Sequence, residues 1–308
     1  MPSPGSGNQI AERQRSPEAI ELLCAFHHAH GTAKHWHMAR LTGTVLVALS
    51  APIVITFAPA LEHPLGAIAG AWVLASRLVL RPAEERAIRF AVAVQEAFDQ
   101  QVLGLPHATA LRPPAYEQIH QHAGRCKAAP DPDWYSVRPQ VPPGAAVLIA
   151  QRSGTVWSRR LHQEWAVVLA ALAAGWTVLT VIIAAVRGAT VGQFLIAVLL
   201  PMLPALLDAT DLCQAHWRAA AERSELEEAL DEHLDQAAHG HRPSLQDLRA
   251  LQDEINRQRL DQPPVPTWYY RFRRASYETS MRAAAERLAR RLDAAAGFTI
   301  ADIGSATP

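Results

Sequence analysis

Arginine and aromatic side chains gather in one short stretch near the C-terminal end, 268–274 (WYYRFRR). Guanidinium groups bind phosphate oxygens in a forked geometry, and aromatic rings stack on nucleobases, so a nucleotide pocket would need this composition. The candidate ligand contacts are Arg152, Trp268, Tyr269, Arg271, Arg273 and Arg274. Composition alone favours a second interpretation that needs no ligand. In it the aromatics anchor the last helix or lie at lipid headgroups, and the arginines pair with glutamates or anionic lipid.

A run of five histidines between residues 27 and 37 could ligate a metal ion, because histidines three or four positions apart share one helix face. No carboxylate or cysteine inside the run completes a ligand set, so we interpret it as a solvated helix at the membrane surface. Cys24, Cys126 and Cys213 are odd in number and far apart, which predicts neither a disulfide framework nor a zinc pattern and suits a reducing cytoplasm. The sequence therefore predicts no metal site and no cofactor.

Catalytic signatures are absent from the sequence. It contains no Walker loop, no GxGxxG, no HExxH and no Gly-x-Ser-x-Gly elbow. The 29 basic residues balance the 29 acidic residues, so bulk charge gives no attraction to a nucleic acid. We expect a protein that is not an enzyme and that does not bind a DNA or RNA duplex.

Four apolar runs dominate the elements that must position these side chains. Residues 165–186 and 188–207 contain no charged side chain and are separated by Arg187 alone, and residues 41–61 and 65–80 form an earlier pair. At about 1.5 Å of rise per helical residue, a run of about 20 residues crosses the roughly 30 Å hydrocarbon core of a bilayer. The sequence therefore predicts an all-α integral membrane protein with two transmembrane helical hairpins, which is four spans.

Basic residues beside the spans set the predicted orientation. Those that the hairpins bring to one side are Lys34, Arg40, Arg77, Arg81, Arg86, Arg159 and Arg160, whereas the opposite loops carry only Arg187 and Glu62. The positive-inside bias then places both termini of this multi-pass protein in the cytoplasm. The predicted segments are a cytoplasmic N-terminal helix (1–40), the first transmembrane hairpin (41–81), a central cytoplasmic helical segment (82–164), the second hairpin (165–207) and a cytoplasmic C-terminal helical region (208–308).

Outside the spans the sequence shows no strand-like alternation. Periodicity and capping residues predict helices over 18–40, 82–105, 116–127, 217–238 and 277–296, one from 145 into the third span, and one from 245 after a capping box at Ser244. The Pro-rich stretch 129–144 is expected to be a loop, and the first few residues are expected to be disordered.

Short motifs spread over most of the chain resemble those of one family. They are Arg13-Gln14, 94–99 (VQEAFD) followed by 102–106 (VLGLP), Trp134-Tyr135, 151–153 (QRS) with Trp157, 251–255 (LQDEI), and 264–270 (PVPTWYY) with Tyr277-Glu278 and Met281. Together with the two-hairpin layout, these motifs resemble the SMODS-associated four-transmembrane effector family of bacterial CBASS antiphage systems, whose members are regarded as pore formers.

This resemblance implies a role in antiviral defence. A neighbouring nucleotidyltransferase would sense infection and make a cyclic di- or oligonucleotide. The cytoplasmic part would bind this second messenger and assemble into a homo-oligomer, and the hairpins would permeabilise the inner membrane, causing abortive infection. Side chains that could wet a pore are few, namely Ser50, Thr56, Thr177, Thr180 and Gln193. Conduction would therefore require an oligomer or a lipid defect.

Two other functions stay open at this stage. A membrane-anchored signalling or scaffold protein without pore activity would use its spans only as a tether. A small-solute transporter would need ionisable groups near mid-bilayer, which the spans lack. Release of dye from liposomes in the presence of cyclic nucleotides separates the first of these from a pore-forming effector.

Overall fold

The computed structural model describes residues 5–108, 111–126, 130–188, 190–195 and 199–304. Every regular element within these ranges is helical, which confirms the predicted all-α class. The helices are α1 (Gly7–Arg13), α2 (Pro17–Phe57), α3 (Glu62–Ala75), α4 (Arg81–Leu103), α5 (Tyr116–Ala123), α6 (Ala145–Val186), α7 (Val191–Phe194), α8 (Leu200–Ala238), α9 (Leu245–Asp261) and α10 (Thr267–Gly304), with a 3-10 turn at Pro59–Leu61 and a π-helical turn at Ser76–Leu80.

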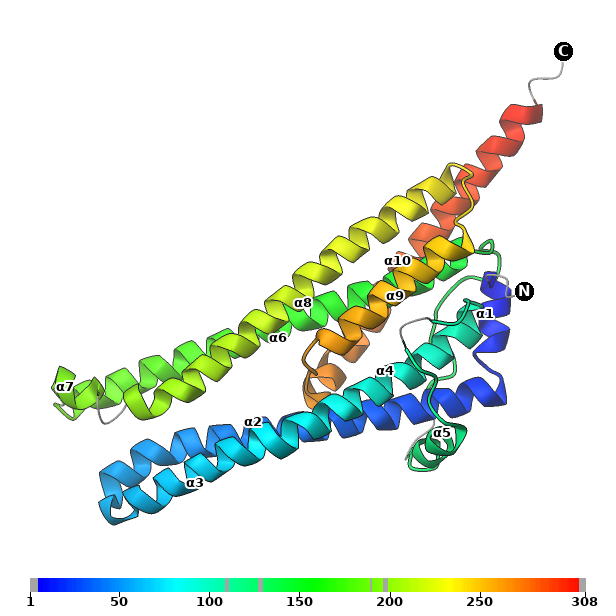
Figure 1. Ribbon diagram of the computed structural model, residues 1–308. Helices are drawn as coiled ribbons and strands as arrows, with labels where there is room; N and C mark the ends of the chain where they lie inside the picture. The colour runs from blue at the N-terminus through cyan, green and yellow to red at the C-terminus, as the bar shows by residue number, and fades with distance from the viewer. Residues whose placement is uncertain (1–4, 109–110, 127–129, 189, 196–198, 305–308) are drawn as a thin grey trace.

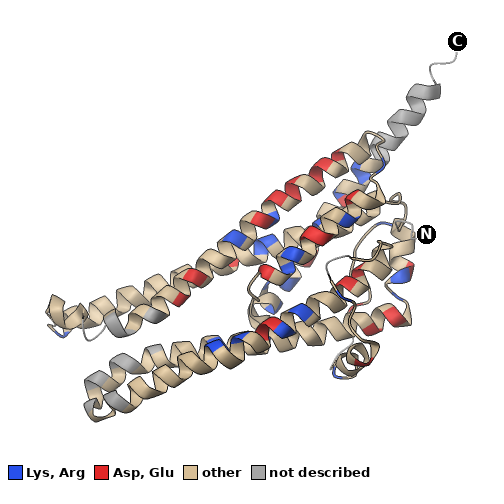
Figure 2. Ribbon diagram, viewed as in Figure 1, with Lys and Arg blue, Asp and Glu red and all other residues tan. Residues whose placement is uncertain are grey.

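Two long helical hairpins organise the molecule (Figure 1). In the first, α2 runs beside α3 and α4, and in the second, α6 runs beside α8. The tips of both hairpins lie at one end of the molecule, and both chain termini lie at the other. Charged side chains gather on the half that carries the termini, whereas the described parts of the hairpin tips are almost free of them (Figure 2). We call residues 41–80 and 165–207 the arms, and the charged remainder the body.

Two helical stretches among the described residues are long and apolar enough to cross a membrane. They are Pro64–Leu103, with a mean hydropathy of 1.2, and Ala145–Val186, with 2.4, and the share of buried residues in these windows is 0% and 6%. Large side chains such as Leu78 and Ile182 therefore face outward. Apolar side chains exposed along such a length indicate contact with lipid. The predicted span 188–207 includes residues 189 and 196–198, which lie outside the described residues.

The first hairpin differs from prediction at Pro82, which the sequence indicated as the start of a new helix. Instead α3, the π-helical turn Ser76–Leu80 and α4 follow one another without a break. The backbone N–H of Arg81 donates to the carbonyl of Ser76, five residues back. A proline ring clashes with the carbonyl four residues before it, and a π-type turn accommodates that conflict locally. The second leg of the hairpin is therefore continuous with the body.

Long helices connect the body to the arms. Helix α2 has 41 residues and α6 has 42, so each is roughly 60 Å long. Ser16 caps α2 by accepting a hydrogen bond from the backbone N–H of Ala19, as the sequence predicts. The predicted helix from residue 145 into the third span is also confirmed. Each of these two helices therefore extends from the body into an arm without a break.

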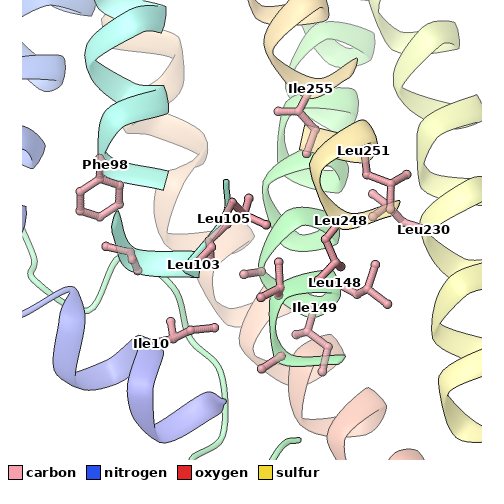
Figure 3. Packing of buried hydrophobic residues seen from close by; sticks show 14 of the residues in the cluster. Ile10, Phe98, Leu103, Leu105, Leu148, Ile149, Leu230, Leu248, Leu251 and Ile255 are labelled. Carbon is pink, nitrogen blue, oxygen red and sulfur yellow. The ribbon is translucent and has the colours of Figure 1, made fainter. Parts of the chain in front are cut away.

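The core of the body lies where α4, α6, α8 and α9 meet (Figure 3). Phe98, Leu148, Ile149, Leu230 and Leu248 come from these four helices and are 0–1% exposed. Each such side chain stabilises the fold by about 1.5–3 kcal/mol when it is removed from water. Because α9 packs against α4 of the first hairpin and against α6 and α8 of the second, it joins the two hairpins inside the body.

The N-terminal residues contain a helix that the sequence did not predict. Helix α1 begins after Ser6, whose hydroxyl and backbone form a capping box with Gln9. Ile10 is fully buried in the core, and a Cβ at Gly7 would lie 1.8 Å from the carbonyl oxygen of Arg138. The close approach to the chain at Arg138 therefore requires glycine. The Pro-, Gly- and Ser-rich composition suggested disorder, because composition does not show that a single residue of this stretch is buried in the core.

Candidate functional site

The stretch 268–274 belongs to helix α10, which begins at Thr267 rather than near residue 277 as predicted. On a helix, consecutive side chains point in different directions, so the arginines and aromatics divide between two sides. Tyr269 is 7% exposed and Tyr277 is 2% exposed, and both pack with Leu161 and Trp165 of α6. Trp268 is 59% exposed. The inward side of this stretch is thus an aromatic anchor for α10.

Glu164 of α6 fixes the polar part of this anchor. Nη2 of Arg273 donates to Oε1 of Glu164 at 2.7 Å, and the hydroxyl of Tyr269 donates to Oε2 at 3.2 Å. Burial opposes ionisation of Glu164, but the hydrogen bonds from Arg273 and Tyr269 outweigh it and lower the pKa of the carboxyl group. These contacts match the interpretation in which the aromatics anchor the last helix and the arginines pair with glutamates.

Arg152 lies apart from this group. Its Nη2 donates to Oε1 of Glu227 at 3.1 Å and to Oδ2 of Asp231 at 3.0 Å, both on α8. Arg152 and Glu164 are twelve residues apart on α6, a distance of about 18 Å along the helix axis. The fold therefore separates Arg152 from the other five candidate contacts.

Two cations near the start of α10, Lys34 and Arg271, have no carboxylate partner among the described residues. Nζ of Lys34, on α2, lies 5.1 Å from the ring centroid of Tyr270. Burial, together with the nearby Arg271, lowers the pKa of Lys34 to about 8. The neighbouring Arg274 pairs with Glu278 one turn further along α10. Lys34 and Arg271 are the pair that an added anion would stabilise, and Lys34 was not among the candidates drawn from the sequence.

A surface hollow among the described residues lies elsewhere. It occupies about 390 Å³ between α8 and α9, and its lining includes the carboxylates of Glu222, Glu225 and Glu254. Acidic walls repel phosphate, so this groove does not suit a nucleotide.

A network of buried polar side chains lies under α9. Glu96 accepts hydrogen bonds from Arg249 at 2.6 Å and from Gln252 at 3.2 Å. Asp99, which is fully buried, accepts from Gln252 at 2.8 Å, from Arg259 at 2.7 Å and from the hydroxyl of Tyr135 at 2.6 Å. The negative charges of two carboxylates and the positive charges of two guanidinium groups therefore balance within one network that joins α4 to α9.

The same network reaches α1 and α6. Gln14 and Tyr135 exchange two hydrogen bonds, in which the side-chain amide of Gln14 donates to the carbonyl of Tyr135 at 3.3 Å and accepts from its N–H at 3.0 Å. Nε2 of Gln151, on α6, donates to Oε1 of Gln252 at 3.1 Å. Five segments far apart in the sequence thus share one set of hydrogen bonds.

Buried titratable groups also line the place where the two hairpins meet. On the first hairpin, Nδ1 of His37 lies 2.6 Å from Oε1 of Glu84. On the second, the Nδ1 atoms of His162 and His216 lie 2.8 Å apart. Burial, together with the nearby His37, lowers the pKa of His216 to about 3, and burial together with His216 lowers the pKa of His162 well below its usual value. His37 is 1% exposed and does not fit the interpretation of the histidine run as a solvated helix, whereas His35 is exposed and His27, His28 and His30 are partly exposed.

A comparison with protein families matches residues 8–288 to the SMODS-associating 4TM effector domain. The chain belongs to this family. The match begins in α1 and ends in α10, so it includes both hairpins and the body. No curated protein and no solved structure matches the chain.

Membership gives the effector its broad role. It is a membrane effector of the kind associated with SMODS and CBASS-type systems, and its family is one of effector domains rather than a known enzyme family. The motifs that indicated the resemblance supply the buried network, since Gln14, Glu96, Tyr135, Gln151 and Gln252 all belong to them. The sequence showed these motifs but not that they meet, because no helical or strand period connects segments more than 100 residues apart.

Proposed function

We propose that this 4TM effector permeabilises the bacterial inner membrane when its cytoplasmic body binds a cyclic di- or oligonucleotide made by a neighbouring nucleotidyltransferase. Both termini and the body lie in the cytoplasm under this proposal, the arms 41–80 and 165–207 lie in the bilayer, and several copies assemble. The observation that carries the proposal is the continuity of α2 and α6, which extend from the body into the arms without a break. A ligand that shifts the body changes the placement of the arms directly.

Permeabilisation would require more than one copy or a defect in the lipid. The hydroxyl groups of Ser50, Thr177 and Thr180 donate to the backbone carbonyls of their own helices. Thr56 lies outside the residues whose side chains are described. A single copy thus presents few free polar groups along its arms, whereas the exposed apolar surface of each arm can pack against other copies or lipid.

Phosphate groups of the ligand would bind at the start of α10. Lys34 and Arg271 are cations that lack a carboxylate partner among the described residues, and a phosphate between them would relieve their repulsion. A second phosphate oxygen would replace Glu164 at Arg273 and so release α10 from α6. The exposed ring of Trp268 would then stack on a base. The other predicted contacts, Arg152, Tyr269 and Arg274, already have carboxylate partners, and their role in binding stays a prediction.

Dye-filled liposomes containing the purified full chain test this proposal against a panel of cyclic di- and oligonucleotides. One ligand of the panel is expected to release the dye. Arg273→Ala should abolish this release without lowering insertion into the liposomes. The matched variant is Glu164→Gln, which breaks the same ion pair but keeps the guanidinium group, and it should still respond to the ligand.

Two results would contradict the proposal. Equal loss of release in Arg273→Ala and Glu164→Gln would mean that Arg273 only anchors α10. An intact bilayer with every ligand of the panel would favour a membrane-anchored scaffold that has no pore activity.

A further inference from the structure

Large aromatic side chains are exposed at the base of the arms, where the body begins. Trp36 on α2, Trp217 on α8 and Phe272 on α10 are 38%, 42% and 74% exposed. None of the three belongs to the hydrophobic clusters of the described residues. One exposed ring is ordinary on a protein surface, but several at one depth mark a surface that binds something.

The positions of the two tryptophans along their helices place them at nearly one depth. Trp36 lies five residues before the start of the first arm, which is about 8 Å of helix. Trp217 follows His216, whose Nδ1 lies 2.8 Å from Nδ1 of His162 on the neighbouring helix. His162 lies three residues, or about 5 Å, before the start of the second arm. Both tryptophans therefore lie just on the body side of the arms.

Helix α10 begins at the same depth and runs away from the arms (Figure 1). The ring centroid of Trp268 lies 5.5 Å from that of Trp165, the first residue of the second arm. Nine residues later, the ring of Tyr277 lies 5.4 Å from that of Trp157, about two turns further into the body. Phe272 is one turn after Trp268, so it also lies within about 6 Å of the arm along the helix.

This depth matches the headgroup layer of a bilayer. The headgroup regions add about 5–8 Å on each side of the hydrocarbon core. Tryptophan is enriched in this layer, because its ring is apolar and its N–H finds polar partners. With the arms in the hydrocarbon core, the three exposed rings fall within the headgroup layer.

Exposed arginines accompany the rings. Arg218 follows Trp217 on α8, and Arg77 lies in the π-helical turn before α4. Both are exposed, and neither has a carboxylate partner among the described residues. A guanidinium group on its long apolar stem can reach from the edge of the hydrocarbon core to a lipid phosphate. Basic residues at this depth are attracted to lipids that carry a net negative charge.

We propose that Arg77 and Arg218 bind the headgroup phosphates of anionic phospholipid in the cytoplasmic leaflet. In this arrangement Trp36, Trp217 and Phe272 lie in the headgroup layer, and the lipid holds the start of α10 at the membrane surface. The inference rests on the arms lying in the bilayer, as in the proposed function, but it requires neither a nucleotide nor a pore.

The full chain in nanodiscs of phosphatidylcholine and phosphatidylglycerol tests the depth of the rings. A nitroxide on the lipid headgroup quenches the fluorescence of nearby tryptophans. Trp36→Phe and Trp217→Phe should each lower the quenched fraction, because each removes a tryptophan from the headgroup layer. Trp134→Phe is the matched control. Trp134 packs against Phe26, ten residues further into the body than Trp36, so its removal should raise the quenched fraction.

Titration of the detergent-solubilised chain with phosphatidylglycerol, followed by native mass spectrometry, tests lipid binding. Arg77→Gln and Arg218→Gln should each weaken binding about fivefold, which is the contribution of one basic residue at an anionic surface. Arg242 provides the control, because it is exposed in the loop between α8 and α9, at the end of α8 remote from the arm. Arg242→Gln should bind phosphatidylglycerol as the unmodified chain does.

The possible failures can be told apart. A chain that does not insert into nanodiscs would overturn both the proposed function and this inference. If the chain inserts but only a water-soluble quencher reaches Trp36 and Trp217, the base of the arms faces water. If neither quencher reaches them, another copy covers the base. Equal affinity of Arg218→Gln and Arg242→Gln for phosphatidylglycerol would overturn the role of the arginines. The last three results would overturn this inference and leave the proposed function standing.

Discussion

Removal of Arg259 should expose how much the body depends on its buried network. Nη1 of Arg259 lies 2.7 Å from Oδ2 of Asp99, whose side chain is 0% exposed. If Arg259 is replaced by methionine, Asp99 keeps its bonds to Gln252 and Tyr135 but loses its cation. Loss of one partner from a buried ion pair costs about 3–5 kcal/mol. For a chain of 308 residues, that corresponds to a fall in melting temperature of about 5–8 °C.

The same helix offers a matched control two residues away. Arg257 pairs with Glu254 at 2.6 Å, but the two side chains are 50% and 37% exposed. An exposed pair contributes about 0.2–1 kcal/mol, so Arg257→Met should lower the melting temperature by about 2 °C or less.

Thermal unfolding of both variants in detergent is the assay. The second change Asp99→Asn, made in the Arg259→Met chain, should recover at least half of the loss because it removes the unpaired charge. If Arg257→Met and Arg259→Met shift the melting temperature equally, the reasoning about the buried network is refuted.

Two further predictions concern the hairpins. Below pH 6.5 the melting temperature should fall, because His216 binds a proton in the unfolded chain but not when it is buried in the folded chain with a pKa of about 3. At pH 5 this difference in protonation should lower the free energy of unfolding by about 2 kcal/mol. His216→Gln should reduce the dependence of the melting temperature on pH. In the first arm, a Cβ at Gly43 would lie 1.9 Å from Cζ2 of Trp72, so Gly43→Leu should force α2 and α3 apart and destabilise the hairpin by about 1–3 kcal/mol. A Cβ at Gly70 would meet nothing within 4 Å, so Gly70→Leu should not destabilise the hairpin. Unfolding in detergent measures both effects, and a pH-independent melting temperature or equal effects of the two leucines would contradict them.

The sequence predicted most helix boundaries that depend on local chemistry. The caps at Ser16 and Ser244 and the end of α8 at Ala238 are confirmed, because a hydroxyl or a nearby glycine marks each. Helix α4 ends at Leu103, two residues earlier than predicted, where Gly104 adopts a left-handed conformation. Three helix starts were wrong. Helix α8 begins at Leu200 rather than at residue 217. Pro82 does not begin a separate helix, and α10 begins ten residues earlier than predicted, because tertiary packing of Tyr269 against α6 outweighs the local pattern.

The sequence predicted less of the candidate site than of the helix boundaries. Composition identified the arginines of 268–274, but it could not assign Arg273 to Glu164 or place Arg152 about 18 Å along α6 from that pair. Likewise, Asp99 and Arg259 are 160 residues apart in the chain, and no periodic pattern relates them. Local chemistry in this protein predicts where helices begin and end, whereas pairing between helices decides which polar groups meet.

The membrane arrangement is tested most directly by the accessibility of tags at residues 2 and 306 in cells. We predict that neither tag reacts with an impermeant probe added to spheroplasts, that both react after lysis, and that the chain leaves the membrane fraction only with detergent. A tag that reacts from the periplasmic side, or a chain that is soluble without detergent, would contradict two membrane-spanning hairpins with the body on their cytoplasmic side.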